Sequence, residues 1–123
     1  MLIINPESMK KKKQANIKIV VELDENKIPE KIIWSAPDGG VNNQISKAIF
    51  LSIWDHKNKE SLSIDLWTKE MPVDEMNEFF YQSVITMGGA FQRATDNNKI
   101  KDVMDKFSEL MKKELNLENK KRS

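Results

Sequence analysis

The chain contains no cysteine and a single histidine, His56. Without cysteine it forms no disulfide, offers no thiolate nucleophile and cannot build a cysteine zinc site. With one histidine, most transition-metal sites and the usual pairs of a nucleophile and a base are excluded as well. Carboxylates are therefore the main candidate catalysts, and the lack of cysteine is compatible with a reducing compartment.

Long apolar runs are also missing from the 123 residues. No run approaches the roughly 20 residues that cross a bilayer, and Leu2 to Ile4 is too short for a secretory signal of about 7 to 15 apolar residues. The 20 basic and 19 acidic residues leave a formal charge of +1, which gives no overall attraction to nucleic acid or anionic membranes. We therefore expect a soluble, cytoplasmic protein without a membrane span.

One domain is expected over residues 16–115, since a chain of this size supports one modest core. Residues 1–15 are interpreted as a disordered basic tail, in which 1–8 form an upstream extension. Residues 116–123, "NLENKKRS", are polar and basic, and we expect them to fray.

Apolar residues alternate with polar ones in the first and fourth of the four segments that we interpret as strands. The first covers residues 17–23 and pairs as a hairpin with an extended run at 28–34, where Pro29 favours the start of an edge strand. The third and fourth are "AIFLSIWD" at 48–55 and "SLSIDLWT" at 61–68, joined by a polar turn. The third segment is apolar on both faces, and a helix is the alternative for it.

The spacing then changes to that of helices. Pro72 fits a helix start, where Asp74 and Glu75 suit the positive end of the helix dipole. An apolar stripe continues to residue 94, and Gly88 and Gly89 within it indicate either a bend or a close packing contact. "TDNN" at 95–98 supplies capping residues for a second helix over 100–115.

Four strands followed by two helices predict an α+β fold. The expected architecture is a four-stranded antiparallel sheet, made of two consecutive hairpins, with both C-terminal helices packed on one face.

Candidate chemical sites have simpler structural explanations. "PDGG" at 37–40 lacks the spacing of phosphate-binding loops, so it is interpreted as a turn, with partner binding as the alternative. His56 falls in a polar turn, and the helix dipole accounts for Asp74 and Glu75. We therefore predict no catalytic residue, no cofactor and no metal site.

The tryptophans are the better candidates for function. If Leu62, Ile64 and Leu66 face the helices, Trp67 falls on the opposite face of the sheet, and Trp54 and Phe50 join it there in one strand register. Large aromatic residues outside a core are typical of protein interfaces. The candidate partner-binding residues are Trp34, Asp38, Gly39, Trp54 and Trp67, and burial of the tryptophans by strand twist and loops is the alternative.

Two stretches carry a family resemblance: "VELDENKIPEKIIWSAPDGG" at 21–40 and "IDLWTKEMPVDEMNEFF" at 64–80. Together they resemble the gliding-motility protein GldC, a small soluble family of gliding bacteria, over roughly residues 16–115. The resemblance implies a role in gliding motility with no enzymatic activity.

The leading hypothesis is thus a non-enzymatic accessory protein that binds a protein of the gliding machinery or forms a homo-oligomer. Two alternatives stay open. One is a carrier of a small apolar ligand, held in a cavity between sheet and helices near Gly88 and Gly89. The other is a nucleic-acid-binding protein that uses the basic tail, with lysines at residues 10–13.

Overall fold

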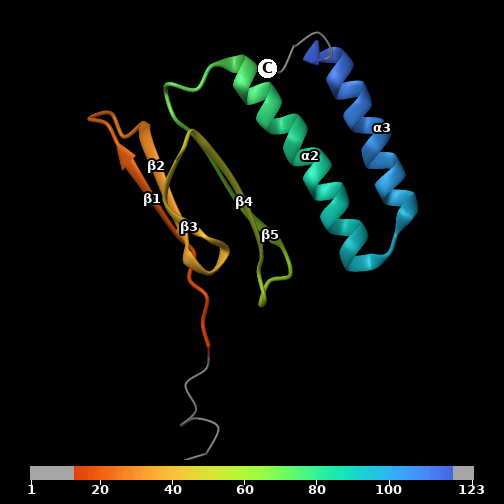
Figure 1. The fold of residues 1–123 in the computed structure, drawn as a ribbon, viewed down its shortest axis with the longest axis horizontal. Coiled ribbons are helices and arrows are strands. Elements are labelled where there is room, and N and C mark those ends of the chain that lie inside the picture. Colours follow the sequence, from red (N-terminus) through yellow and green to blue (C-terminus); the bar gives the residue numbers. More distant parts are fainter. Residues whose placement is uncertain (1–12, 118–123) are drawn as a thin grey trace, which may run out of the picture. The chain divides into compact units, whose positions relative to one another are not determined.

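The computed structural model describes residues 13–117. The chain divides into two compact units, which meet in sequence between Glu70 and Met71. Unit 1 contains strands and unit 2 contains helices (Figure 1), so the α+β class is confirmed. The proposed extension at 1–8, most of the basic tail and residues 118–123 lie outside the described residues.

Unit 1 begins with a three-stranded antiparallel sheet. Its strands are β1 (Lys18–Leu23), β2 (Pro29–Ala36) and β3 (Val41–Ser46), in the order β1-β2-β3. The β1–β2 hairpin was predicted. Pro29 does start β2, but β2 is the central strand and not an edge strand, so that part of the prediction is wrong.

A tight loop joins β2 to β3, as the turn interpretation of "PDGG" predicts. Pro37–Gly39 forms one turn of 3-10 helix, η1, and Gly40 adopts a left-handed backbone with φ of 78°. The Gly40 N–H donates to the Pro37 carbonyl at 3.0 Å. Gly40 is thus a structural residue, because glycine adopts this left-handed backbone conformation at no steric cost.

Strand β3 was not predicted from the sequence. Its middle residues, Asn42, Asn43 and Gln44, have low strand propensity. The pairing is irregular where Asn43 takes a positive φ of 48°. There Ser35 Oγ accepts the Asn43 N–H at 2.9 Å and lies 3.3 Å from Asn43 Oδ1, which compensates locally for the disturbed ladder.

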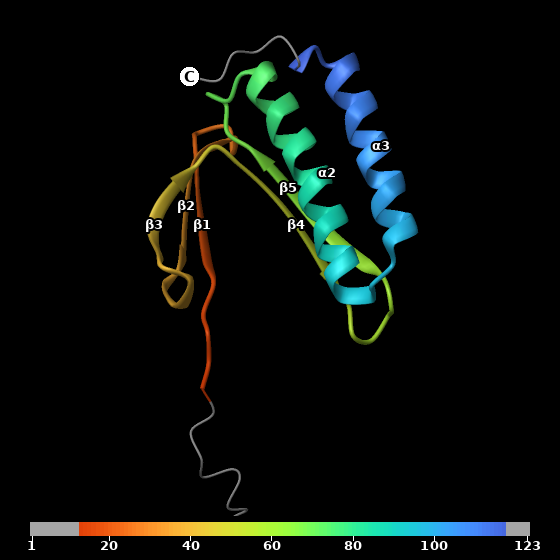
Figure 2. The same cartoon turned by 45° about the vertical axis from the view of Figure 1, so that its right-hand side comes forward.

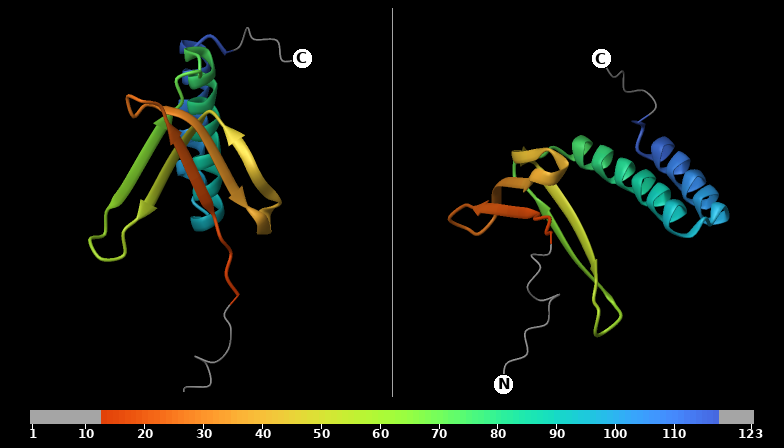
Figure 3. Two further views of the ribbon diagram at one scale, coloured as in Figure 1. Left: turned by 90° about the vertical axis from the view of Figure 1, so that its left-hand side faces the viewer. Right: turned by 60° about the horizontal axis from the view of Figure 1, so that its bottom comes forward.

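The second sheet of unit 1 is a hairpin of β4 (Ala48–Trp54) and β5 (Ser61–Trp67) (Figure 3). The prediction of one four-stranded sheet is therefore wrong: five strands form a three-stranded and a two-stranded sheet. The reason is the connection between β3 and β4, where Lys47 is the single intervening residue. A hairpin needs about two loop residues to reverse the chain, so β4 cannot fold back on β3 and starts a new sheet.

Backbone contacts after β5 fix the corner where the two sheets meet. The Thr68 N–H and hydroxyl both donate to the Lys47 carbonyl, at 2.9 and 2.7 Å. The Lys69 N–H donates to the Pro29 carbonyl at 3.2 Å. Thr68 is only 4% exposed, so these bonds lie away from solvent competition, and they hold the end of β5 against the start of β2.

Unit 2 consists of two antiparallel helices, α2 (Val73–Thr95) and α3 (Asn98–Glu114) (Figure 2). Pro72 is the residue just before α2, and its carbonyl accepts the N–H groups of Glu75 and Met76 at 3.1 Å. Asn97 caps α3 as predicted, since its Oδ1 accepts the Ile100 N–H at 3.1 Å. The packing of both helices on a sheet face stays a prediction.

The two glycines of α2 have different surroundings. A Cβ placed on Gly88 would lie 3.1 Å from Met104 Cβ, whereas one on Gly89 would meet only the tip of Arg93, at 3.4 Å. α2 continues through both glycines. Of the two predicted explanations, close packing is therefore confirmed for Gly88, where α3 approaches the bare backbone.

The buried core is small. Among the described residues, Ile32, Val84 and Leu117 are the buried hydrophobic side chains, and only Ile32 is fully enclosed. A chain with 39% hydrophobic residues therefore leaves much apolar surface exposed on both units.

Gly89→Ala should stabilise unit 2, while Gly88→Ala should gain less or destabilise. Each alanine gains roughly 1 kcal/mol of helix propensity. At position 88 the new methyl group also presses on Met104, and overpacking costs about 1 to 3 kcal/mol. Thermal and urea unfolding of both variants measure the difference. Equal stabilisation by the two alanines would show that the contact with Met104 is loose.

Asp24→Asn should destabilise the protein at pH 7, and this destabilisation should disappear as the pH falls. The Ile28 N–H, followed by Lys69 Nζ at 3.0 Å, lowers the pKa of Asp24 below its usual value. A lowered folded-state pKa stabilises the fold above the unfolded-state pKa, near pH 4, and this contribution disappears as the pH drops through the folded-state pKa. The parent should thus be more stable at pH 7, with the gap closing toward about pH 2.

Urea unfolding across this pH range measures the gap. Glu25→Gln, at the adjacent exposed carboxyl group, is the matched control and should give a smaller gap. A gap for Asp24→Asn that stays constant down to pH 2 would contradict the role of the ionised carboxylate.

Candidate interaction surface

The β4–β5 hairpin separates its side chains cleanly by face. The register pairs Ile49 with Leu66, Leu51 with Ile64, and Ile53 with Leu62. Directly opposed residues of antiparallel strands share a face, so six aliphatic side chains form one face, which we call the aliphatic face. Its members are Ile49, Leu51, Ile53, Leu62, Ile64 and Leu66.

The opposite face carries the aromatic residues. The register pairs Ala48 with Trp67, Phe50 with Asp65, Ser52 with Ser63, and Trp54 with Ser61. This arrangement places Phe50, Trp54 and Trp67 together on what we call the aromatic face. The face opposite Leu62, Ile64 and Leu66 is therefore aromatic. The strand register is the one that places Trp54 on the same face as Trp67.

Serines connect the aromatic residues along this face. Ser52 Oγ lies 2.6 Å from Ser61 Oγ, and the Ser63 hydroxyl donates to Ser52 Oγ at 3.1 Å. Near the other end, the Trp67 indole N–H donates to Asp65 Oδ2 at 2.9 Å. The serine hydroxyl groups and the Asp65 carboxylate thus lie between the aromatic rings, so that apolar and hydrogen-bonding groups alternate along this face.

Both faces of this hairpin are accessible. On the aromatic face, Phe50 is 55% and Trp54 is 68% exposed. On the aliphatic face, Ile53, Leu62 and Ile64 are each more than half exposed. An isolated two-stranded sheet is marginally stable in water. A single layer packed on this hairpin would cover one of its faces, and the other face would still expose apolar side chains.

The five residues predicted as a partner site do not form one cluster. Trp54 and Trp67 share the aromatic face, but five residue pairs lie between them along the hairpin, so they are about 20 Å apart at the strand rise. Trp34 lies half-buried on β2 of the other sheet. Asp38 and Gly39 are exposed in η1.

Three contributors were missed by the sequence reasoning: Ser52, Ser61 and Ser63, which supply hydroxyl groups on the aromatic face. Phe50, which the sequence placed beside Trp54 in one register, lies on this face between Trp54 and Trp67. Apolar residues on both faces of residues 49–54 were the available signal. The sequence did not give the strand register, which places Ser61 and Ser63 of β5 beside Trp54 and Phe50 of β4.

No cluster of metal ligands is found in the described part of the chain. Residues 13–117 contain no group of three or more His, Asp or Glu side chains placed to hold a metal ion. His56 lies exposed in the β4–β5 turn, where Asp55 Oδ2 accepts the Asn58 N–H at 2.6 Å. Neither helix within the described part of the chain is long and apolar enough to cross a membrane.

The three described groups with a shifted pKa all belong to exposed ion pairs. Hydrogen bonds to Asp24 and Glu30 raise the pKa of Lys69, and a hydrogen bond to Asp105 raises that of Lys101. Asp24, considered above, is the third. Each shift favours the charged form of a surface ion pair.

Comparison with known proteins identifies the family. The model of the family described as "Gliding motility-associated protein GldC-like" matches residues 29–117. This range runs from the start of β2 through both helices and covers well over half of the chain. No curated protein and no solved structure matches the chain. The resemblance carried by "SAPDGG" and "LWTKEMPVDEM" is thereby confirmed: the chain belongs to the GldC-like family of gliding motility-associated proteins.

Proposed function

We propose that this protein is a non-enzymatic accessory protein of bacterial gliding motility, acting in the cytoplasm by binding another protein through the aromatic face of β4–β5. The observation that carries the proposal is the exposure of Phe50 and Trp54 beside the hydrogen-bonded serines of the aromatic face. Family membership supplies the process, gliding motility. The surface supplies the mode of action, protein binding.

The composition of the aromatic face favours a protein partner. Exposed aromatic rings provide large contact area with little loss of side-chain freedom, and tryptophan is prominent among residues that dominate binding energy. The hydroxyl groups of Ser52, Ser61 and Ser63 add adaptable hydrogen bonding between the rings. A partner that inserts apolar side chains around Trp54 and meets the serines at its polar rim suits this pattern.

The two alternatives have less support. The ligand-carrier hypothesis drew on free space beside Gly88, and Met104 fills that space. The nucleic-acid hypothesis drew on lysines at residues 10–13, of which residue 13 alone is described. No feature of the described residues favours either alternative over protein binding.

Trp54→Ser should abolish partner capture without unfolding the protein. Because Trp54 is 68% exposed, we expect a stability change of at most about 0.5 kcal/mol. Loss of a tryptophan that dominates an interface costs about 2 kcal/mol or more of binding free energy, so affinity should fall roughly thirtyfold or more. The measurement is crosslinking in gliding cells, followed by purification and identification of the bound proteins.

Ile45→Ser is the matched control. Ile45 is 64% exposed on β3, in the other sheet, so its substitution removes similar apolar surface away from the aromatic face. We expect the parent and Ile45→Ser to capture a gliding-machinery protein and Trp54→Ser to lose this capture. Equal capture by all three folded proteins would refute a role for the aromatic face, and capture of a second copy alone would replace the accessory partner with self-association.

A further inference from the structure

Strand β1 forms an open edge of the first sheet. In the order β1-β2-β3, β1 pairs with β2 on one side, and no described strand pairs with its other side. Figure 1 shows β1 at the margin of unit 1. The outward N–H and C=O groups of β1 are therefore available to a further strand.

The two edge strands of this sheet differ in regularity. The β1–β2 register shifts between Glu22 and Leu23, but the extra residue there, Glu30, belongs to the central strand β2. β1 itself is therefore regular. In β3 the irregularity lies in the edge strand, where Asn43 takes a positive φ of 48°. Irregular edges resist strand addition, so β1 is the edge that can accept a strand.

The sequence of β1 is self-complementary about Val20. On either side of Val20 stands one aliphatic residue, and beyond these stand Lys18 and Glu22. In an antiparallel pair centred on Val20, Lys18 of each copy lies directly opposite Glu22 of the other copy. Opposite charges that face each other across a ladder attract. A pair of identical strands thus gains this attraction twice.

The core face of the sheet continues across the same pairing. Val21 is paired with Ile32, which is fully buried, so the odd-numbered residues of β1 share the core face. Ile17 and Leu23 also have odd numbers, and they are 74% and 51% exposed. The pairing centred on Val20 sets Ile17 of one copy opposite Leu23 of the other. Both exposed side chains thereby gain an apolar neighbour.

Lys18 and Glu22 have no ion-pair partner in their own chain. Both are exposed, and no ion pair among the described residues includes either of them. The β2 neighbour of Glu22 in the register is Lys31. In the pairing centred on Val20, each Glu22 therefore lies between Lys31 of its own chain and Lys18 of the second copy.

Registers shifted by one residue lose this match. The outward backbone groups of an edge strand come from every second residue, so two copies of one strand pair about a residue and not about a peptide bond. In both neighbouring registers Val20 lies opposite a charged residue, Lys18 or Glu22. One of them sets Lys18 opposite Asp24, whose carboxylate already pairs with Lys69 at 3.0 Å. The centre at Val20 is the register that matches both charges.

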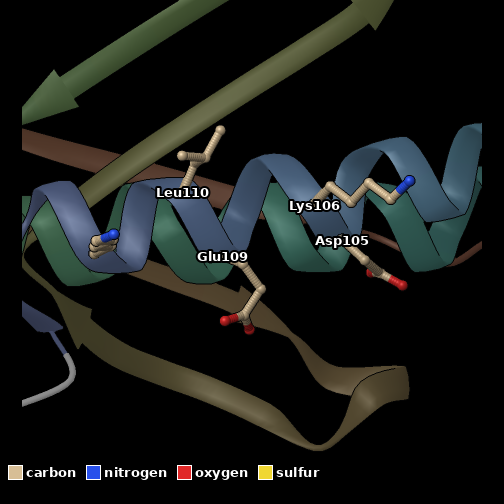
Figure 4. Close-up of a pocket in the computed structure, with 5 residues that line it drawn as sticks. Asp105, Lys106, Glu109 and Leu110 are labelled. Carbon is tan, nitrogen blue, oxygen red and sulfur yellow. The ribbon is translucent and has the colours of Figure 1, made fainter.

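The surface of α3 in unit 2 shows the contrasting case. An open depression there is lined by Asp105, Lys106, Glu109 and Leu110, among others (Figure 4). Acidic and basic side chains border it together, so its charge selects no class of partner. On β1, each charge has a fixed position relative to Val20 and so specifies its counterpart.

We propose that two copies of this chain form a dimer through antiparallel pairing of β1 centred on Val20. The two three-stranded sheets then become one sheet of six strands, and the irregular β3 edges close the assembly at a dimer. Each copy keeps its own β4–β5 hairpin, so the dimer carries two aromatic faces. The proposal goes beyond the function proposed for the aromatic face and does not rest on it.

The charges on β1 also have a protective explanation. Charged side chains on an edge strand keep other strands away. That protection acts against a second copy only when like charges meet. Here the symmetry of the strand brings Lys18 to Glu22, so the same charges that reject other strands favour a second copy.

Sedimentation velocity of the full chain at increasing concentration measures the association. We expect a monomer and dimer in equilibrium. Lys18→Glu should weaken dimerisation about tenfold or more, because two attractive cross-strand pairs become two repulsive ones. Glu22→Lys should have the same effect. High salt should reduce the difference from the parent, since exposed charges are screened.

A charge swap separates pairing from folding. The double variant Lys18→Glu with Glu22→Lys should restore dimerisation, because the two charges exchange places about Val20. Lys57→Glu is the matched control: it makes the same charge change at an exposed lysine in the β4–β5 turn and should dimerise like the parent.

A single cysteine reports the register, since the chain has none of its own. In the proposed pairing Val20 lies opposite itself, with Cα atoms about 4.5 to 5.5 Å apart, which is within reach of a disulfide. Val20→Cys should form an intermolecular disulfide under mild oxidation. Lys57→Cys, away from β1, controls for random collision and should crosslink much more slowly.

Three results would overturn the proposal. These are a parent that stays monomeric at every concentration, a dimer that neither single charge reversal weakens, and crosslinking of Val20→Cys no faster than that of Lys57→Cys. A dimer that Trp54→Ser dissociates would assign self-association to the aromatic face instead. We expect Trp54→Ser to dimerise like the parent, so failure here is distinguishable from failure of the aromatic-face proposal.

Discussion

The Lys47 carbonyl is the constraint on which unit 1 depends. It lies in the one-residue link between β3 and β4 and accepts both the N–H and the hydroxyl of Thr68. The link is too short for a hairpin, so the chain must leave the first sheet, and the double hydrogen bond then fixes where β5 ends. Lys69 extends the corner through the Pro29 carbonyl and through ion pairs with Asp24 and Glu30.

This corner has a direct consequence for function. Because β4 and β5 form their own two-stranded sheet, neither strand is sheltered by further neighbours, and apolar residues lie on both faces. The aromatic face on which the proposed partner binding rests is one of these two faces.

Much of the local structure could be predicted from the sequence. Alternation identified β4 and β5, capping residues placed α3, and "PDGG" was correctly interpreted as a turn. β3 was missed because Asn42, Asn43 and Gln44 have side chains typical of loops, and their pairing depends on Ser35 in another strand. The number of sheets followed from that error, since it hid the short link at Lys47. For the aromatic face, the sequence indicated Trp54, Phe50 and Trp67, but it did not indicate the serines that the strand register places beside them.

The helices illustrate a more general limit of pattern reading. An apolar stripe predicts that a helix packs against another element. It does not show which residues of the stripe contact the neighbouring helix and which stay exposed. Gly88 decides this in unit 2. Because it lacks a side chain, α2 admits Met104 of α3 at this point, while Val103, Phe107 and Leu110 of the same apolar stripe stay exposed.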